Sequence, residues 1–80
     1  MTKQQLRLRT IIVDDEPLAR RLLRSLLDDI PEVELIAECR NGREAIEATR
    51  ELAPDLLILD IQMPGSSGLD VVKELQADTM

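Results

Sequence analysis

The chain has 80 residues, of which 44% are hydrophobic and 32% are charged, a composition typical of one small globular domain with a marginal core. It contains neither an apolar run of the roughly 20 residues that a membrane helix needs nor a secretory signal, so we expect a cytoplasmic protein without a membrane segment. The net charge of −6 becomes −9 after the basic first ten residues, and Phe, Trp and Tyr are absent, which together make these residues a poor binder of nucleic acid.

The first third of the sequence predicts a strand followed by a helix. Residues 8–13 (LRTIIV) end in β-branched residues and stop at the acidic cluster 14–16, as a buried strand does. Pro17 suits a first helical turn, and Pro31 ends the run. Apolar residues at helical spacing between the two prolines predict a core stripe: Leu18, Leu22, Leu23, Leu26, Leu27 and Ile30. The basic residues of the same segment predict a solvated face: Arg20, Arg21 and Arg24.

The middle of the sequence predicts a second strand and a second helix. Residues 33–39 (VELIAEC) alternate in part, which favours a half-exposed strand at the edge of a sheet. Cys39 is interpreted as a small apolar strand residue, because the chain has no second Cys and no His to complete a disulfide or a zinc site. Asn41 is expected to cap a helix together with Glu44, and Pro54 closes that helix.

The last part of the sequence predicts a third strand and a third helix. Residues 56–59 (LLIL) are uniformly apolar, which is typical of a central strand covered by helices on both faces. After a loop that contains Met63, Pro64 and Gly65, Ser67 is expected to cap the helix. Strands that alternate with helices in this way predict an α/β fold with a parallel sheet and right-handed crossovers.

Three aspartates follow two of the predicted strands. Asp14 and Asp15 come directly after the first strand, and Asp60 comes after the third. In an open parallel sheet, ligands bind outside the carboxyl ends of the strands, where the strand order reverses. If these strands are neighbours, three carboxylates converge there, and like charges so close together need a hard cation. Oxygen ligands without His or Cys favour Mg²⁺, which commonly binds together with a phosphate.

A plainer interpretation is open for the first two aspartates. An acidic cluster just before Pro17 can stabilise the positive end of a helix by about 0.3 to 1 kcal/mol, without any ligand. Asp60 does not fit that interpretation, because a charge that directly follows Leu-Leu-Ile-Leu must be paired or functional to be tolerated.

The segments "IIVDDEPLARRLLRSLL", "NGREAI" and "PDLLILDIQMPGSSGLDVV" strongly resemble the receiver (CheY-like) domain of bacterial two-component response regulators over residues 8–76. The resemblance implies a flavodoxin-like three-layer sandwich. It implies that Asp60 is the phosphoacceptor, which takes a phosphoryl group from a sensor histidine kinase or a small acyl phosphate. It also implies that Asp15, Asp60 and the backbone carbonyl of Gln62 bind Mg²⁺ directly, with Asp14 acting mainly through water.

The wording "DDEPLARRLL" is similar to the subgroup of response regulators whose output is a LytTR-type DNA-binding domain. This similarity implies a transcriptional regulator whose DNA-binding domain lies outside these residues. A receiver assists its own phosphorylation but does not turn over a separate substrate, so an enzyme is not expected.

The sequence departs from the family in its second half. Receiver domains have five strands in the order 2-1-3-4-5 and five helices, whereas only the first three repeats are matched here. We therefore expect a tail at 1–7 and an incomplete receiver domain at 8–80. The Ser or Thr of the fourth strand and the Lys of the fifth cannot be assigned, since Lys73 and Thr79 are not at matching positions. Residues 56–59 then become an edge strand, which favours a homodimer through that edge or a poorly stable monomer.

Two other functions compete with the phosphoacceptor. The chain could be a fragment that cannot be phosphorylated and serves only for interaction or dimerisation. A Mg²⁺-dependent phosphohydrolase ranks last, because such enzymes need a second acid or base near the nucleophile, and the amide of Gln62 cannot serve as one.

Overall fold

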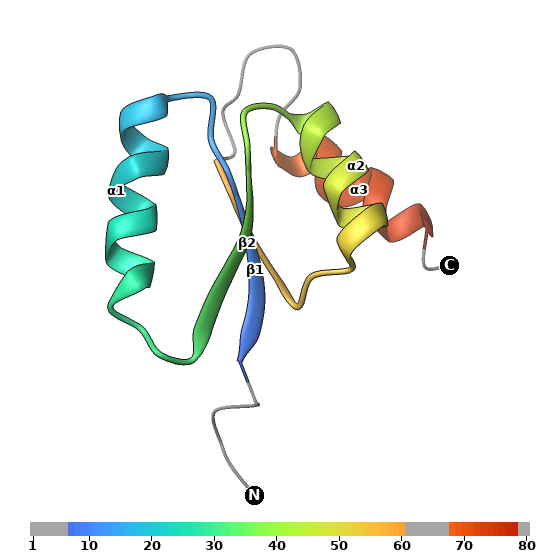
Figure 1. Ribbon diagram of the computed structural model, residues 1–80. Coiled ribbons are helices and arrows are strands. Elements are labelled where there is room, and N and C mark those ends of the chain that lie inside the picture. Colours follow the sequence, from blue (N-terminus) through green and yellow to red (C-terminus); the bar gives the residue numbers. More distant parts are fainter. Residues whose placement is uncertain (1–6, 61–67, 79–80) are drawn as a thin grey trace, which may run out of the picture.

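The computed structural model describes residues 7–60 and 68–78, and it confirms the predicted alternation of strands and helices (Figure 1). In chain order the elements are β1 (Leu8–Val13), α1 (Pro17–Asp28), β2 (Val33–Cys39), α2 (Gly42–Leu52), β3 (Leu56–Leu59) and α3 (Gly68–Asp78). Helix α1 ends at Asp28, so Ile30 lies outside the helix in which it was expected.

The three strands form one parallel sheet in the order β2-β1-β3, as predicted. At the carboxyl end of the sheet, Val13 of β1 is paired with Cys39 of β2 and with Leu59 of β3. All three strands therefore end at the same level. The residues that follow them emerge together at one edge of the sheet, where parallel sheets place their ligands.

Helices cover the sheet from both sides, α1 on one face and α2 with α3 on the other (Figure 1). This arrangement is the three-layer, flavodoxin-like architecture. The buried core lies between the sheet and the α2–α3 layer, and consists of Ile11, Val13, Cys39, Ala45 and Val71. Cys39 is a free and buried thiol, which confirms its interpretation as an apolar strand residue. Burial raises the pKa of this thiol, and the nearby Glu44 carboxylate raises it further.

The third strand is the edge strand that the incomplete match to the family predicts, and only the expectation of a central strand, drawn from its uniformly apolar residues, is wrong. Within the part of the chain that the structure describes, β3 lies at one edge of the sheet, and Leu56 is exposed. Leu57 and Leu59 pack toward the core under α2 and α3. Among the described residues, helix α1 packs mainly on β2 and β1 rather than on β3.

The expected core stripe of α1 is also wrong for most of its members. Leu18, Leu22 and Leu26 are 70%, 61% and 55% exposed, whereas Leu23 and Leu27 are half-buried. The helix turns its Leu23–Leu27 side toward the sheet. The adjacent side of the helix, about 100° around its axis, carries Leu22 and Leu26. No other element covers that side among the described residues, because the sheet extends only as far as β3.

The second helix begins as predicted. The backbone N–H of Glu44 donates a hydrogen bond to Oδ1 of Asn41 at 2.9 Å, and the Glu44 carboxylate in turn accepts one from the backbone N–H of Arg40 at 2.9 Å. The helix ends at Leu52 and is capped by Ala53, which adopts the left-handed conformation with φ 47° and ψ 62°, directly before Pro54. Ser67, the cap expected for α3, lies outside the described residues.

Candidate functional site

The ends of β1 and β3 bring two of the predicted aspartates side by side. The backbone N–H of Asp14 donates to the carbonyl oxygen of Cys39 at 3.1 Å, and the backbone N–H of Asp60 donates to that of Val13 at 3.0 Å. Each bond extends the sheet ladder by one residue beyond the strand. The backbone at both aspartates is therefore as well fixed as the sheet itself.

The carboxylates of Asp14, Asp15 and Asp60 converge as predicted. One oxygen from each of the three lies within 4.8 Å of those from the other two, and all three residues are half-buried. Three negative charges at this separation repel one another, and partial burial weakens the screening by water. A positive charge bound between these carboxylates would therefore stabilise the arrangement.

Helix capping accounts for only part of this acidic cluster. Oδ1 of Asp14 accepts a hydrogen bond from the backbone N–H of Glu16 at 3.0 Å, a local turn that needs no ligand. Glu16 occupies the N-cap of α1 but makes no side-chain capping bond. The plainer interpretation therefore explains one contact of Asp14 and leaves the convergence of Asp15 with Asp60 unexplained.

The size and chemistry of the cluster fit a small, hard divalent cation. Mg²⁺ binds oxygen at about 2.1 Å in an octahedron, which places ligand oxygens about 3 to 4 Å apart. The observed limit of 4.8 Å is close to that range, so small side-chain rotations suffice to close the site. Mg²⁺ takes only one or two carboxylates and keeps waters for the rest, which matches half-buried rather than enclosed ligands.

Arg20 is a residue of this site that the sequence analysis missed. It was expected on a solvated face, but its side chain is only 15% exposed. Its Nη1 donates a hydrogen bond of 2.6 Å to the backbone carbonyl of Asp14. The signal that could have found it is its spacing, since Arg20, Leu23 and Leu27 follow one another at i, i+3 and i+7 and so share the inner face of α1.

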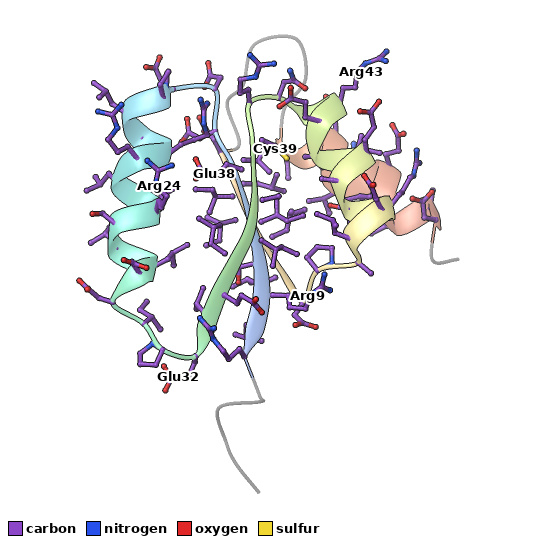
Figure 2. All side chains as sticks on the ribbon, in the orientation of Figure 1. Arg9, Arg24, Glu32, Glu38, Cys39 and Arg43 are labelled. Carbon is purple, nitrogen blue, oxygen red and sulfur yellow. The ribbon has the colours of Figure 1, made fainter. Side chains whose placement is uncertain are left out.

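A short chain of charges connects Arg20 with the second strand. Nε of Arg20 lies 4.0 Å from a carboxylate oxygen of Glu38, whose other oxygen is 2.7 Å from Nη1 of Arg24. Figure 2 shows Arg24 on α1 and Glu38 on β2 facing each other across the space between helix and sheet. Arg24, which is half exposed, thus closes the network on the solvent side.

One expected ligand, and one of the two residues judged not to match the family's hydroxyl and Lys, lie outside the described part of the chain. Gln62, whose backbone carbonyl was expected as a ligand, falls in the segment 61–67, and Thr79 follows the end of α3. Lys73 is described and lies exposed on α3.

Across residues 7–60 and 68–78, no helix combines the length and the apolar character needed to cross a membrane.

Comparison with known proteins finds relatives among transcriptional regulatory proteins and protein-glutamate methylesterases. The chain is 51% identical to the transcriptional regulatory protein BtsR of Salmonella typhi, over 89% of this chain and 30% of that protein. It is 48% identical to a protein-glutamate methylesterase/protein-glutamine glutaminase of Carboxydothermus hydrogenoformans, over 84% of this chain and 19% of that protein. The chain therefore spans less than a third of the length of these curated relatives.

Solved structures agree with the fold. The signal receiver domain of NarL from Mycobacterium tuberculosis superposes with a TM-score of 0.87 at 28% identity, over 92% of this chain and 60% of that one. The response regulator domain of CheB from Thermotoga maritima gives 0.84 at 31% identity, over 89% of this chain and 53% of that one. The family described as the response regulator receiver domain matches residues 10–80. The chain thus belongs to the response regulator receiver domain family, a family of signalling modules.

Proposed function

We propose that the chain is the phosphoacceptor module of a two-component signalling system, in which Asp60 receives a phosphoryl group with the help of Mg²⁺. The observation that carries this proposal is the convergence of three carboxylate oxygens, from the ends of two neighbouring strands, within 4.8 Å. The donor would be a phosphohistidine of a sensor histidine kinase or a small acyl phosphate. The chain turns over no substrate of its own in this scheme.

The reaction needs a nucleophile and a way to balance charge. A carboxylate oxygen of Asp60 attacks the phosphorus, the new P–O bond forms, and the bond to the donor's histidine nitrogen or acyl oxygen breaks with its electron pair. Bound Mg²⁺ supplies positive charge against the phosphoryl oxygens. Asp15 and Asp60 would hold it directly, Asp14 through water, and the backbone carbonyl of Gln62 would complete the protein ligands.

Phosphorylation would change the charge of the protein at one edge of the sheet. An aspartyl phosphate adds negative charge and strong hydrogen-bond acceptors next to the turn that leads into α1. We assign residues 8–80 to the receiver and 1–7 to a tail, and place the protein in the cytoplasm. Its relatives include transcriptional regulatory proteins, which supports a role in transcription with a separate output domain, of the LytTR type in our proposal.

The test is intact mass after incubation with Mg²⁺ and a small acyl phosphate. We expect the parent chain to gain one phosphoryl group and the Asp60→Asn variant to gain none. Asp28→Asn is a matched control, because it removes an exposed carboxylate at the other end of α1. A parent chain that binds Mg²⁺ but is never phosphorylated would contradict the proposal.

That outcome would favour a second candidate, an interaction piece that forms a homodimer through β3. Its support is the open side of β3 within the described residues, together with the exposed Leu56. A strand edge of this kind can pair with the same edge of a second copy. We expect a dimer in sedimentation equilibrium and its dissociation by Leu56→Lys with unchanged circular dichroism. A parent chain that stays monomeric at tens of micromolar would refute the dimer.

A further inference from the structure

The backbone of Asp14 is held on both sides of its Cα, through the N–H of the peptide before it and the carbonyl oxygen of the peptide that joins it to Asp15. Cys39 accepts the N–H of Asp14, and Arg20 donates to the carbonyl oxygen of Asp14 at 2.6 Å. That carbonyl belongs to the same planar peptide group as the backbone nitrogen of Asp15. Holding the oxygen therefore restricts the movement of this peptide group, and with it the positions open to the backbone of Asp15.

Arg20 is itself well restrained. Its side chain is only 15% exposed, and Glu38 lies 4.0 Å from its Nε. The 2.7 Å pair between Glu38 and Arg24 keeps the Glu38 carboxylate in place. A planar guanidinium that is mostly buried presents its N–H groups in a more fixed direction than a flexible ammonium does.

We propose that Arg20 is a positioning residue of the acidic site: it holds the Asp14–Asp15 peptide so that the Asp15 carboxylate stays close to that of Asp60, where the two could bind a cation. This inference rests on the proposed function, since it concerns the same Mg²⁺ site. It makes no use of Arg20 as a ligand. The guanidinium contacts the backbone of the turn and acts through Asp15.

Electrostatics alone predicts the opposite effect of removing Arg20. A positive charge near the carboxylates disfavours a divalent cation, so replacing Arg20 by a neutral residue should tighten Mg²⁺ binding. Positioning predicts that the same replacement weakens binding, because the Asp14–Asp15 peptide loses its anchor. The sign of the change in affinity separates the two explanations.

The experiment is a calorimetric titration of the 80-residue chain with Mg²⁺, at constant ionic strength. We expect Arg20→Gln to bind Mg²⁺ about tenfold more weakly than the parent, the scale found when groups that orient metal ligands are removed. Arg21→Gln is the matched control, because it removes the same charge from the next, exposed position of α1 and should leave the affinity within about twofold. Arg20→Lys retains the charge and one donor, and should recover part of the loss.

Amide hydrogen exchange without metal tests, independently of function, whether Arg20 holds the Asp14–Asp15 peptide. We expect Arg20→Gln to accelerate exchange at Asp14 while Ile12, inside β1, stays protected, which also shows that the variant is folded. If the parent chain binds no Mg²⁺, the proposed function fails. Hydrogen exchange at Asp14 still shows whether Arg20 holds the Asp14–Asp15 peptide. Equal or tighter Mg²⁺ binding by Arg20→Gln, or unchanged exchange at Asp14, would overturn the inference.

Discussion

Replacing Asp15 by Asn should have opposite effects on stability with and without Mg²⁺. Without the cation, the change removes one of three negative charges whose oxygens lie within 4.8 Å of one another. The free energy of unfolding should therefore rise. With saturating Mg²⁺, the parent gains the binding free energy of the cation and the variant gains little. The order of stability should then reverse.

The size of the first effect follows from the separation of the charges. At 4.8 Å, Coulomb's law gives about 0.9 kcal/mol for one pair in water and about 3.5 kcal/mol at an effective dielectric constant of 20. The three residues are half-buried, so a value near the lower limit applies to each pair. Asp15 takes part in two of the three pairs. Its neutralisation should stabilise the fold by about 1 to 2 kcal/mol.

The second effect depends on the concentration of Mg²⁺ relative to its dissociation constant. At hundredfold excess over that constant, linkage adds about 2.7 kcal/mol to the stability of the parent, which exceeds the gain expected from Asp15→Asn. Urea denaturation with Mg²⁺, and with KCl of equal ionic strength, measures both effects in one series. Glu34→Gln provides the control, since it removes an exposed carboxylate near the amino end of β2, at the opposite edge of the sheet from the aspartates. Equal responses of parent and Asp15→Asn to Mg²⁺ would refute a cation site at these carboxylates.

Two further predictions concern the ends of α2. Ala53→Gly should stabilise the protein by about 0.5 to 1 kcal/mol in thermal unfolding, because glycine avoids the cost of the left-handed conformation but gains entropy in the unfolded chain. A destabilised variant would show that the Ala53 methyl group packs usefully. Glu44 has a pKa below its ordinary value of 4.5, through its hydrogen bonds with Arg40, so it stabilises the fold above that value. The stability difference between the parent and Glu44→Gln should vanish as the pH falls through the lowered pKa, and a difference that persists in acid would contradict this linkage.

The fold was predictable from local patterns wherever one short segment contained the whole signal. The strand of residues 8–13 and the Asn41 cap followed from β-branched residues, turn residues and capping chemistry, and the structure confirms both. Burial was less predictable, because it depends on what lies across from a residue. Leu22 has the same helical spacing as a core residue, yet it is 61% exposed, because no third layer meets its side of α1 among the described residues.

The candidate site was likewise only partly predictable from the sequence. The meeting of Asp15 with Asp60 could be predicted, since parallel strands place the residues that follow them at one edge of the sheet. The role of Arg20 could not, because its contact is with a backbone carbonyl, a group that every residue has. A side chain that binds the backbone has no partner side chain that the sequence could identify. Only the packing of α1 against the sheet shows which carbonyl Arg20 contacts.

Helix α1 connects the site with the exposed apolar surface of the fold. Its inner face holds the sheet through half-buried Leu23 and Leu27 and through Arg20, whereas Leu18 and Leu22 lie open on the next flank. A layer that covered this flank would hold α1 more firmly against β1 and β2. It would thereby restrict the motion of the guanidinium that clamps the Asp14–Asp15 turn. If a covering layer and a bound cation both fixed this turn, each would favour the other to the same extent, because coupling between two sites is reciprocal.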